Sequence, residues 1–443
     1  MGVDTSNNLD VEAASFVPKT AYIDPEYAKL ERARLWPKVW QVACREEELA
    51  SIGDYVEYTV LDESIIVVRT APDEIRAHFN TCQHRGRQLV DGVGQVQHFR
   101  CPFHGWRYEL DGTLSEVTDR GDFRGCDLKL DLQSCQVDTW GGFVFVHMDP
   151  ANTTPLAAFL DPVPQYLDPF ELGAMRFRWY KTVVFKCNWK TALDAFNEGY
   201  HFSATHPQLL PVMDERTTSV PMGDHAMFRN ADDNEGLGVP SPRLAQRKFE
   251  DPRVLVSRYM QIMEDEVDAM WSPSAFEATR QRLLAEVPEG TDAMTVLGAL
   301  IGFHQQSAEA EGAGWPDITF EQMAAAGWDW HVFPNLVLLP QPTGMLMYRA
   351  RPAGPDPDRC LFDVWSLVRF APGSEPPIER VWIEDWKEHD GWGRIFRQDW
   401  ANIEAVQRGL HSQGFAGLRT NPVKESAIPN YHRVLRRYLH DGE

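Results

Sequence analysis

The 443-residue chain has few cysteines, a deficit of basic side chains and no long apolar run. Seven cysteines are too sparse for a disulfide scaffold and indicate a reducing compartment, where Cys/His groupings more often bind metals. With 43 Lys and Arg against 65 Asp and Glu, the net charge is −22. This balance disfavours a nucleic-acid binder and adhesion to anionic membranes. No apolar run approaches the roughly 18 residues of a membrane span, and the N-terminus lacks the pattern of a secretory signal. We therefore expect a cytoplasmic protein.

Apolar side chains are plentiful: 43% of the residues are hydrophobic and 11% are aromatic, including 15 Trp. These proportions are those of a globular protein with a large core and room for an apolar pocket. At roughly 100–200 residues per domain, two domains are the simplest interpretation. Short β-branched runs from residue 54 onward, with the hairpin dipeptide Asp111-Gly112, predict a small all-β domain over residues 41–158. Residues 1–40 are then a helical segment that packs on a second, mixed domain of residues 159–443.

The second domain combines helices and strands. We expect a strand at 175–185, helices at 189–204, 253–269, 275–286, 292–310 and 396–410, and strands at 335–339, 344–349 and 361–370.

The most specific motif lies in the β domain, where Cys82-x-His84 is followed after 16 residues by Cys101-x-x-His104. Each pair closes a short chelate on a tight loop. Zinc accepts such ligands, but its common pairs are Cys-x₂₋₄-Cys and His-x₃₋₅-His. In a Rieske [2Fe–2S] centre, two Cys hold one iron and two His hold the other, so each loop supplies one ligand of each type. The spacing favours the Rieske centre, with a zinc site and simple core packing as the alternatives.

The flanking sequence agrees with a cluster site. Gly86 and Gly105 follow the two histidines and allow the backbone to approach closely. Residues 76–110 carry a net charge of +3 although the chain carries −22. A basic surface around the cluster would dock an acidic ferredoxin, with Arg85 and Arg87 as the candidate contacts. The alternative is that these arginines only brace the loops.

A second group of candidate ligands lies on the predicted helix 189–204. Glu198 and His201 are three residues apart and would share one helix face. His206 is five residues beyond His201 and converges with it only if the helix bends or ends, for which Pro207 provides a reason. Two His and one carboxylate, with other positions open, form the facial triad of non-haem Fe(II) oxygenases.

The third ligand of such a triad need not be close in sequence. The predicted helix 396–410 offers two inward carboxylates, Asp399 and Glu404. Taken alone, a His pair is more often an ordinary packed feature of the core, but a Rieske motif in the same chain favours the metal site.

The two motifs together resemble the catalytic α subunits of Rieske non-haem iron ring-hydroxylating oxygenases. The similarity runs from the Cys/His loops through Asn188-Trp189-Lys190 and Glu198-x-Tyr-His-x₄-His to Phe333-Pro334-Asn335 and Gln398-Asp-x₄-Glu-x₂-Gln. The resemblance implies that the cluster ligands are Cys82, His84, Cys101 and His104. It implies that the mononuclear iron ligands are His201, His206 and Asp399, with Glu404 as the structural alternative to Asp399.

The resemblance also implies an α+β fold, in which an all-β Rieske domain is inserted in a helix-grip (START-like) catalytic domain with an antiparallel sheet. Subunits of the family assemble head to tail as a homotrimer, with a small β subunit in some members. Glu198 stands where the family usually has an Asp that carries electrons between the Rieske His of one subunit, here His104, and the iron of the next. Asp194 stands where several relatives have Asn.

The implied function is the oxygenase component of a multicomponent system. It would take electrons from NAD(P)H through a reductase, with or without a ferredoxin, and use O₂ to hydroxylate a bulky, mainly apolar aromatic or polycyclic ring in aromatic catabolism. The alternative is a monooxygenase or demethylase acting on a non-aromatic or O/N-methylated substrate. The expected pocket residues are Asp194, Phe202, Phe333 and Asn335. An electron-transfer Rieske protein would need only the β domain, and a zinc protein would contain no iron.

Overall fold

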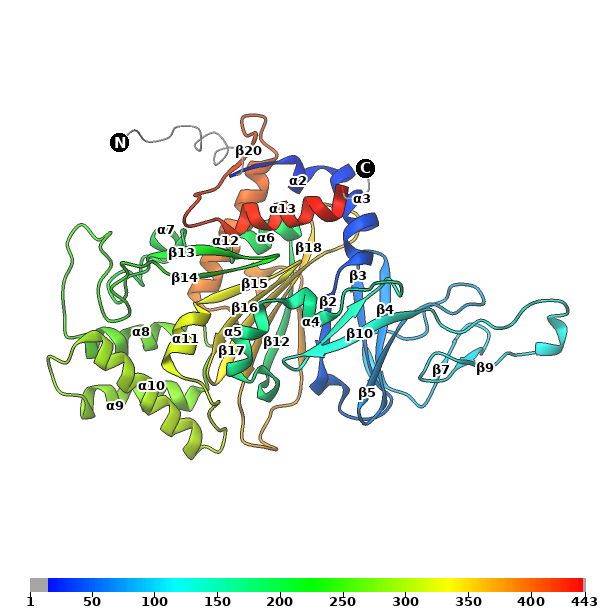
Figure 1. Cartoon of the computed structure of the whole chain (residues 1–443), viewed down its shortest axis with the longest axis horizontal. Helices are drawn as coiled ribbons and strands as arrows, with labels where there is room; N and C mark the ends of the chain where they lie inside the picture. The colour runs from blue at the N-terminus through cyan, green and yellow to red at the C-terminus, as the bar shows by residue number, and fades with distance from the viewer. Residues whose placement is uncertain (1–14, 441–443) are drawn as a thin grey trace. The chain divides into compact units, whose positions relative to one another are not determined.

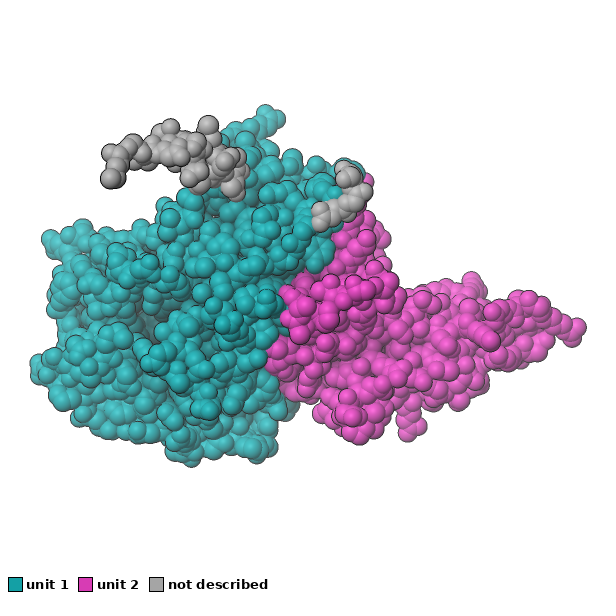
Figure 2. All heavy atoms as spheres, in the orientation of Figure 1, with its two compact units in different colours: residues 1–28, 160–443 teal, residues 29–159 magenta. Residues whose placement is uncertain are grey.

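The computed structural model describes residues 15–440, with the side chains of 273–275, 277 and 278 left out. The first 14 positions of the predicted segment 1–40 therefore lie outside the described residues. The chain divides into two compact units, residues 29–159 and residues 1–28 with 160–443 (Figure 2). Among the described residues, no helix is both long and apolar enough to cross a membrane.

The unit of residues 29–159 is mainly β (Figure 1). A seven-stranded antiparallel sheet has the order β2-β11-β10-β5-β4-β3-β6, and a second sheet has the order β7-β8-β9. The strands are β2 (Gln41–Arg45), β3 (Asp54–Val60), β4 (Glu63–Ala71), β5 (Glu74–Phe79), β6 (Val93–Gln95), β7 (Phe99–Arg100), β8 (Arg107–Tyr108), β9 (Leu114–Glu116), β10 (Ser134–Trp140) and β11 (Phe143–His147). Short 3₁₀ turns lie at Glu46–Leu49 and Arg120–Asp122.

Local chemistry explains these strands. β3 and β4 are β-branched runs joined by a tight turn, and Val60 pairs with Glu63 across it. The predicted Asp111-Gly112 turn lies between β8 and β9, with Gly112 at φ +90°, a conformation that favours glycine. The core of this unit includes Cys82 and Cys101. Both predicted cluster cysteines are thus buried on the loops that join these short strands.

The other unit is built on an eight-stranded sheet of order β13-β14-β15-β16-β17-β18-β12-β19, antiparallel except for the parallel pair β12–β19. Its strands are β12 (Arg176–Phe185), β13 (Thr217–Met222), β14 (His225–Asn230), β15 (Asp329–Val332), β16 (Leu336–Gln341), β17 (Gly344–Pro352), β18 (Cys360–Val368) and β19 (Arg380–Ile383). β1 (Phe16–Pro18) pairs with β20 (Gly417–Arg419) in a separate ribbon.

The helices are α2 (Thr20–Ile23), α3 (Pro25–Leu30), α4 (Leu156–Leu160), α5 (Val163–Leu167), α6 (Trp189–Asp194), α7 (Phe202–Thr205), α8 (Pro252–Glu266), α9 (Pro273–Glu286), α10 (Ala293–Ala310), α11 (Phe320–Ala326), α12 (Arg394–Leu410) and α13 (Ala427–His440). Short π and 3₁₀ turns occur at Glu31–Leu35, Trp36–Lys38, Asp168–Phe170, Leu172–Ala174 and Trp386–Glu388. α6 packs on β17 and β18, α12 packs on α6, and α13 packs on β14. The predicted α+β fold with an antiparallel sheet is confirmed.

The predicted helix 189–204 is wrong in its middle. The chain is helical over α6 and over the single turn of α7, and residues 195–201 between them form a loop. Gly199 helps to explain the break, because a Cβ there would lie 2.5 Å from the Thr217 hydroxyl. The close approach of β13 therefore competes with a continuous helix.

The sequence interpretation also missed β13, β14 and β15. Every residue of β15 is buried, so the strand lacks the alternation of apolar and polar residues that identifies a half-exposed strand.

Candidate functional site

Three predicted ligands meet beside α12. The imidazoles of His201 and His206 and the carboxylate of Asp399 each offer one atom, and these atoms lie within 4.8 Å of one another. The Asp399 Oδ1 atom is 3.1 Å from His206 Nε2 and 3.8 Å from His201 Nε2. Glu404, one turn further along α12, instead contacts the Lys387 ammonium at 3.1 Å. The geometry therefore selects Asp399 over Glu404 as the third donor.

Both imidazoles are oriented by acceptors on their other nitrogen. Glu198 Oε1 lies 2.7 Å from His201 Nδ1, and Gln398 Oε1 lies 2.9 Å from His206 Nδ1. A carboxylate and an amide oxygen only accept, so each Nδ1 carries the proton and each Nε2 presents its lone pair to the centre. Metal-binding histidines usually have such a hydrogen-bond acceptor on the ring nitrogen that does not bind the metal. The donor set fits a divalent iron with open positions.

Glu198 and His201 also interact electrostatically. Burial lowers the pKa of His201, but the hydrogen bond and the charge of Glu198, with a contribution from Asp399, raise it overall. Glu198 Oε2 accepts backbone N–H bonds from Tyr200 and, at 3.1 Å, from His201. The loop 195–201 is therefore folded around the Glu198 carboxylate. The predicted continuous helix would not allow this arrangement.

Three further hydrogen bonds position α6 and α12 beside the candidate ligands. The Asn188 side chain caps α6 by accepting from the Lys190 N–H at 3.0 Å. Gln407 of α12 accepts from the Asn188 N–H at 3.1 Å and from the Thr191 hydroxyl at 2.7 Å. Because Gln407 lies two helical turns after Asp399, these bonds set the position of the face of α12 that carries Asp399 against α6.

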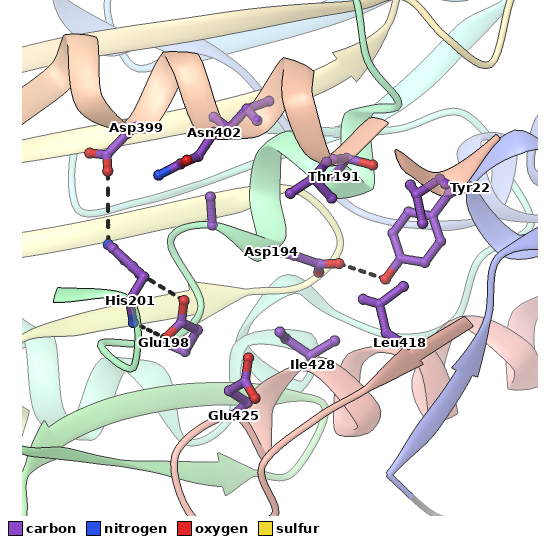
Figure 3. Close-up of a pocket in the computed structure, with 14 residues that line it drawn as sticks. Tyr22, Thr191, Asp194, Glu198, His201, Asp399, Asn402, Leu418, Glu425 and Ile428 are labelled. Atoms are coloured by element: carbon purple, nitrogen blue, oxygen red, sulfur yellow. Dashed lines mark hydrogen bonds and ion pairs between the residues drawn. The ribbon is translucent and has the colours of Figure 1, made fainter. Parts of the chain in front are cut away.

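A pocket of about 290 Å³ opens on one side of this centre (Figure 3). Asp194, Glu198, His201, Asp399 and Glu425 supply its carboxylates and imidazole, among apolar side chains of α12 and α13.

Asp194 is tied to distant parts of the chain. Its Oδ2 accepts from the Tyr22 hydroxyl at 2.6 Å (Figure 3). This hydroxyl is 2.7 Å from His432 Nε2. Burial raises the pKa of Asp194 to about 7, although the Tyr22 bond and the Lys190 charge oppose the rise. Tyr22 and His432 were not predicted, and no local motif marks them.

The other predicted pocket residues have different surroundings. The Phe202 ring lies 4.9 Å from the His201 ring and 5.8 Å from the His206 ring. Phe333 and Asn335 are not among the residues that line the described pocket. Phe333 packs on Tyr431 and Tyr438 of α13, and the Asn335 amide donates to the Ala350 carbonyl at 2.8 Å.

The two Cys/His loops have matching backbones. The Gly86 N–H donates to the Cys82 carbonyl at 2.9 Å, and the Gly105 N–H donates to the Cys101 carbonyl at 3.0 Å. The two glycines have φ of +77° and +76°, which favours glycine at both positions. The Tyr108 hydroxyl lies 3.5 Å from the Cys82 sulfur.

The side chains on these loops fit a Rieske cluster. Both sulfurs are buried, and burial raises the pKa of the Cys82 thiol, with Cys101 adding to the rise. The rings of His84 and His104 are 4.7 Å apart. Their Nδ1 atoms are buried and have no hydrogen-bond partner among the described residues. Buried polar nitrogens without a partner are costly unless a ligand satisfies them, and two iron-binding imidazoles would be satisfied in this way.

The predicted docking arginines are exposed on these loops. The Arg85 guanidinium stacks over the exposed Phe103 ring, 4.9 Å from its centroid. Arg87 donates to the Gln88 carbonyl at 2.7 Å. Neither contact neutralises the positive charge.

Comparison with known proteins identifies both units. The family model "Ring hydroxylating alpha subunit (catalytic domain)" matches residues 172–441, more than half of the chain, and the model "Rieske [2Fe-2S] domain" matches residues 39–129. Both predicted cofactors, the [2Fe–2S] cluster and the mononuclear non-haem iron, are those of this family.

Three curated relatives resemble parts of the chain. The carnitine monooxygenase oxygenase subunit of Escherichia coli K12 is 33% identical over 201 residues, 43% of this chain and 52% of that protein. The glycine betaine monooxygenase oxygenase subunit of Pseudomonas aeruginosa UCBPP-PA14 is 29% identical over 201 residues, 44% of this chain and 46% of that protein. The anthranilate 1,2-dioxygenase large subunit of Acinetobacter baylyi is 30% identical over 212 residues, 45% of this chain and 44% of that protein. The chain thus matches about half the length of each relative.

Solved structures extend the likeness of fold over nearly the whole chain. A quaternary ammonium Rieske monooxygenase in complex with L-carnitine has a TM-score of 0.65 at 18% identity, covering 97% of this chain and 98% of that one. Naphthalene 1,2-dioxygenase from a Rhodococcus species has a TM-score of 0.62 at 20% identity, covering 98% and 97%. With the family match, the conclusion is that this chain belongs to the ring-hydroxylating α-subunit family of Rieske non-haem iron oxygenases and contains the family's Rieske [2Fe–2S] domain.

Proposed function

We propose that the protein is the oxygenase component of a Rieske monooxygenase that oxidises a small, non-aromatic quaternary ammonium compound. The observation that carries the oxygenase assignment is the converging His201, His206 and Asp399 donor set, with both Nδ1 protons held by acceptors. The partial matches to carnitine and glycine betaine monooxygenase subunits support the substrate class.

This substrate differs from the bulky aromatic ring that the sequence interpretation preferred, and corresponds to its alternative. Glu198, in place of the Asp usual in ring-hydroxylating relatives, supports the change. The anthranilate dioxygenase match, at comparable identity, keeps an aromatic carboxylate as the second candidate.

The proposed reaction balances as follows. O₂, two electrons and two protons convert one C–H bond next to the cationic nitrogen into C–OH, and the second oxygen atom leaves as water. The hydroxylated carbon then releases a neutral tertiary amine, a carbonyl compound and one proton. When bound, the cluster supplies single electrons and the mononuclear iron activates O₂. A reductase, with or without a ferredoxin, would deliver the electrons from NAD(P)H.

The residues around the proposed metal centre orient its ligands. Glu198 and Gln398 keep the two Nδ1 protons in place, and the apolar ring of Phe202 lies beside both imidazoles. We further propose, from the family resemblance, that Glu198 is the electron bridge between subunits of a homotrimer. Arg85 and Arg87 would receive the redox partner.

The test uses the purified protein with both metal sites loaded, a reductase and NADH. L-carnitine, glycine betaine and choline are compared with anthranilate and naphthalene under ¹⁸O₂. The proposal predicts cation-dependent O₂ uptake, a neutral tertiary amine, and one labelled oxygen atom in the carbonyl product when it is reduced to the alcohol before its oxygen exchanges with water. Two labelled atoms in a dihydroxylated ring, with no turnover of any cation, would refute it and establish the second candidate.

The His201→Ala variant tests the site separately from the substrate. It should retain the visible Rieske spectrum, lose mononuclear iron and form no product. Product formation at the wild-type rate would show that the His201, His206 and Asp399 assignment is wrong.

A further inference from the structure

A buried carboxyl group on β15 has no hydrogen-bond or ion-pair partner within the described part of the chain. Asp329 is 2% exposed, and no hydrogen-bond donor or cation among the described residues contacts its side chain. Burying a carboxyl group without a compensating partner is strongly unfavourable. Such a group is retained more readily when a ligand supplies the missing partner.

Another buried acid of the same sheet shows how the fold compensates a structural carboxylate. Asp363 on β18 lies 2.7 Å from Arg349 and 3.2 Å from Arg351, and it accepts from the Thr182 hydroxyl at 2.7 Å. Burial raises the pKa of Asp363, but these partners lower it overall. Asp329 has none of these compensations.

Strand register places Asp329 on the face of the sheet that α6 and α12 cover. On β15, Asp329 and His331 share one face because side chains alternate along a strand. His331 pairs with Val337, which pairs with Tyr348. The Tyr348 ring contacts Phe196 at 4.2 Å and Trp400 of α12 at 6.4 Å. Asp329 therefore points to the same side as the helix that carries Asp399.

Electrostatics place Asp329 near the metal ligands. Beyond burial, Asp399 and Asp329 each raise the pKa of Tyr348, so its phenol lies close to both carboxylates. The charge of Glu198 acts on Asp329 in the same way. The carboxyl group of Asp329 is thus within electrostatic reach of the loop that holds His201.

Aromatic rings connect Asp329 to the metal centre. Phe228 pairs directly with Asp329 across β14 and β15, so both side chains lie on one face. The Phe228 ring is 6.1 Å from Phe202, which itself contacts both metal-binding imidazoles. Aromatic rings such as those of Phe and Tyr bind quaternary ammonium groups through cation–π contacts, and a nearby carboxylate adds a compensating negative charge.

We propose that Asp329 is a specificity-determining residue that binds the cationic nitrogen of the substrate, with Phe228 and Tyr348 as its aromatic neighbours. This inference rests on the proposed function and deepens it. The preference of the enzyme for a positively charged substrate would then depend on one carboxyl group that is not a candidate metal ligand.

The proposal has a signature in the unmodified enzyme. Burial, with the charge of Glu198, raises the pKa of Asp329 well above its ordinary value and so favours the protonated carboxyl group in the free enzyme. The other titratable groups facing it are the Tyr348 phenol and His331, whose pKa burial lowers to about 3. A bound cation favours the ionised carboxylate, so binding should release about one proton. A neutral ligand of the same shape should release none.

The experiment compares each cation with its carbon isostere by calorimetry on the holoenzyme, in two buffers of different ionisation enthalpy. The pairs are glycine betaine with 3,3-dimethylbutyrate and choline with 3,3-dimethylbutanol. The variants are Asp329→Asn, which keeps the shape of a protonated carboxyl group, and Asp232→Asn as the matched control. Asp232 lies on an exposed loop, paired with Arg229, and its replacement changes the formal charge equally.

Wild type and Asp232→Asn should bind the cation at least about tenfold more tightly than its isostere and release a proton. Asp329→Asn should bind both ligands within about threefold and release none. If Asp329→Asn still turns over the cation, keeps the tenfold preference and still releases a proton, this inference is wrong. The proposed function would then stand. A wild type that turns over no cation would overturn the proposed function and this inference with it. If Asp329→Asn does not fold, a wild type that binds the cation and its isostere within about threefold refutes the role of Asp329.

Discussion

The hydrogen bond between Gln398 and His206 provides the sharpest test of how the metal centre is built. In the Gln398→Leu variant, a side chain of similar size remains, but the acceptor 2.9 Å from His206 Nδ1 is lost. Gln398 also accepts from the Gln208 amide at 2.9 Å, which in turn contacts Glu266 at 2.8 Å. The variant therefore frees the imidazole to rotate or to place its proton on Nε2, the atom that faces Asp399.

The magnitude follows from the kind of bond that is removed. Loss of the hydrogen-bond partner of a metal-binding histidine typically lowers the affinity for the metal by about 10–100-fold. The bond to Gln398 is uncharged, and such bonds contribute about 0.5–1.5 kcal/mol net. We therefore expect the lower end, about a tenfold increase in the Kd for Fe(II), which corresponds to about 1.4 kcal/mol.

The assay is chelator competition for mononuclear iron on the purified protein, with the visible Rieske absorption recorded in the same samples. The absorption should stay unchanged, because Gln398 and the Cys/His loops belong to different compact units. Gln398→Glu is the matched control, since it keeps an acceptor oxygen and should bind iron at least as tightly as wild type. Equal Fe(II) affinity in Gln398→Leu and wild type would refute the idea that this bond orients His206.

Three further predictions follow from individual contacts. Because the pKa of Asp194 is raised to about 7, the folded protein keeps a proton there that the unfolded chain releases near pH 4; stability is therefore lost as pH rises through this window. Asp194→Asn should remove that loss. In urea denaturation, the free energy of unfolding of the variant relative to wild type should therefore be a few kcal/mol larger at pH 8 than at pH 5. Tyr108→Phe removes the hydroxyl 3.5 Å from the Cys82 sulfur, and redox titration should show a cluster potential lower by roughly 20–60 mV, from one neutral hydrogen bond in a one-electron couple. Gly199→Ala places a methyl group 2.5 Å from the Thr217 hydroxyl, and metal analysis should show reduced mononuclear iron because the loop before His201 must move.

Matched controls separate these effects from general damage. Gly302 in α10 has open space around its Cβ position, so Gly302→Ala should keep full iron content and gain up to about 1 kcal/mol of stability. Full iron content in Gly199→Ala as well would contradict the close-approach explanation. An unchanged cluster potential in Tyr108→Phe would show that the sulfur contact has no electronic effect. A pH profile of Asp194→Asn parallel to that of wild type would show that Asp194 is ionised in the folded protein.

The substrate assignment shows how far motif reasoning extends. The resemblance to ring-hydroxylating oxygenases, with an aromatic content that leaves room for an apolar pocket, favoured a bulky ring substrate, yet aromatic side chains also surround quaternary ammonium groups. Composition does not separate these uses. The distinction depends on whether a carboxylate lies among the rings, as Asp329 does beside Phe228.

The sequence by itself determined the two motifs and the kind of metal chemistry. Chelating pairs such as Cys82-x-His84 are local, and the ligand types of a short segment already limit which metals it can bind. It also identified the long amphipathic helix that carries Asp399, because helical periodicity is a local property.

Only the tertiary structure decided which distant groups meet. Gly199 breaks the helix because Thr217 of another strand approaches it, and Gln398 holds His206 from across 192 positions of the chain. The burial of Asp329, with no partner among residues 15–440, likewise depends on which strands and helices surround β15. Contacts between residues far apart in the sequence depend on how the chain packs, and packing leaves no periodic pattern in the segments that it brings together.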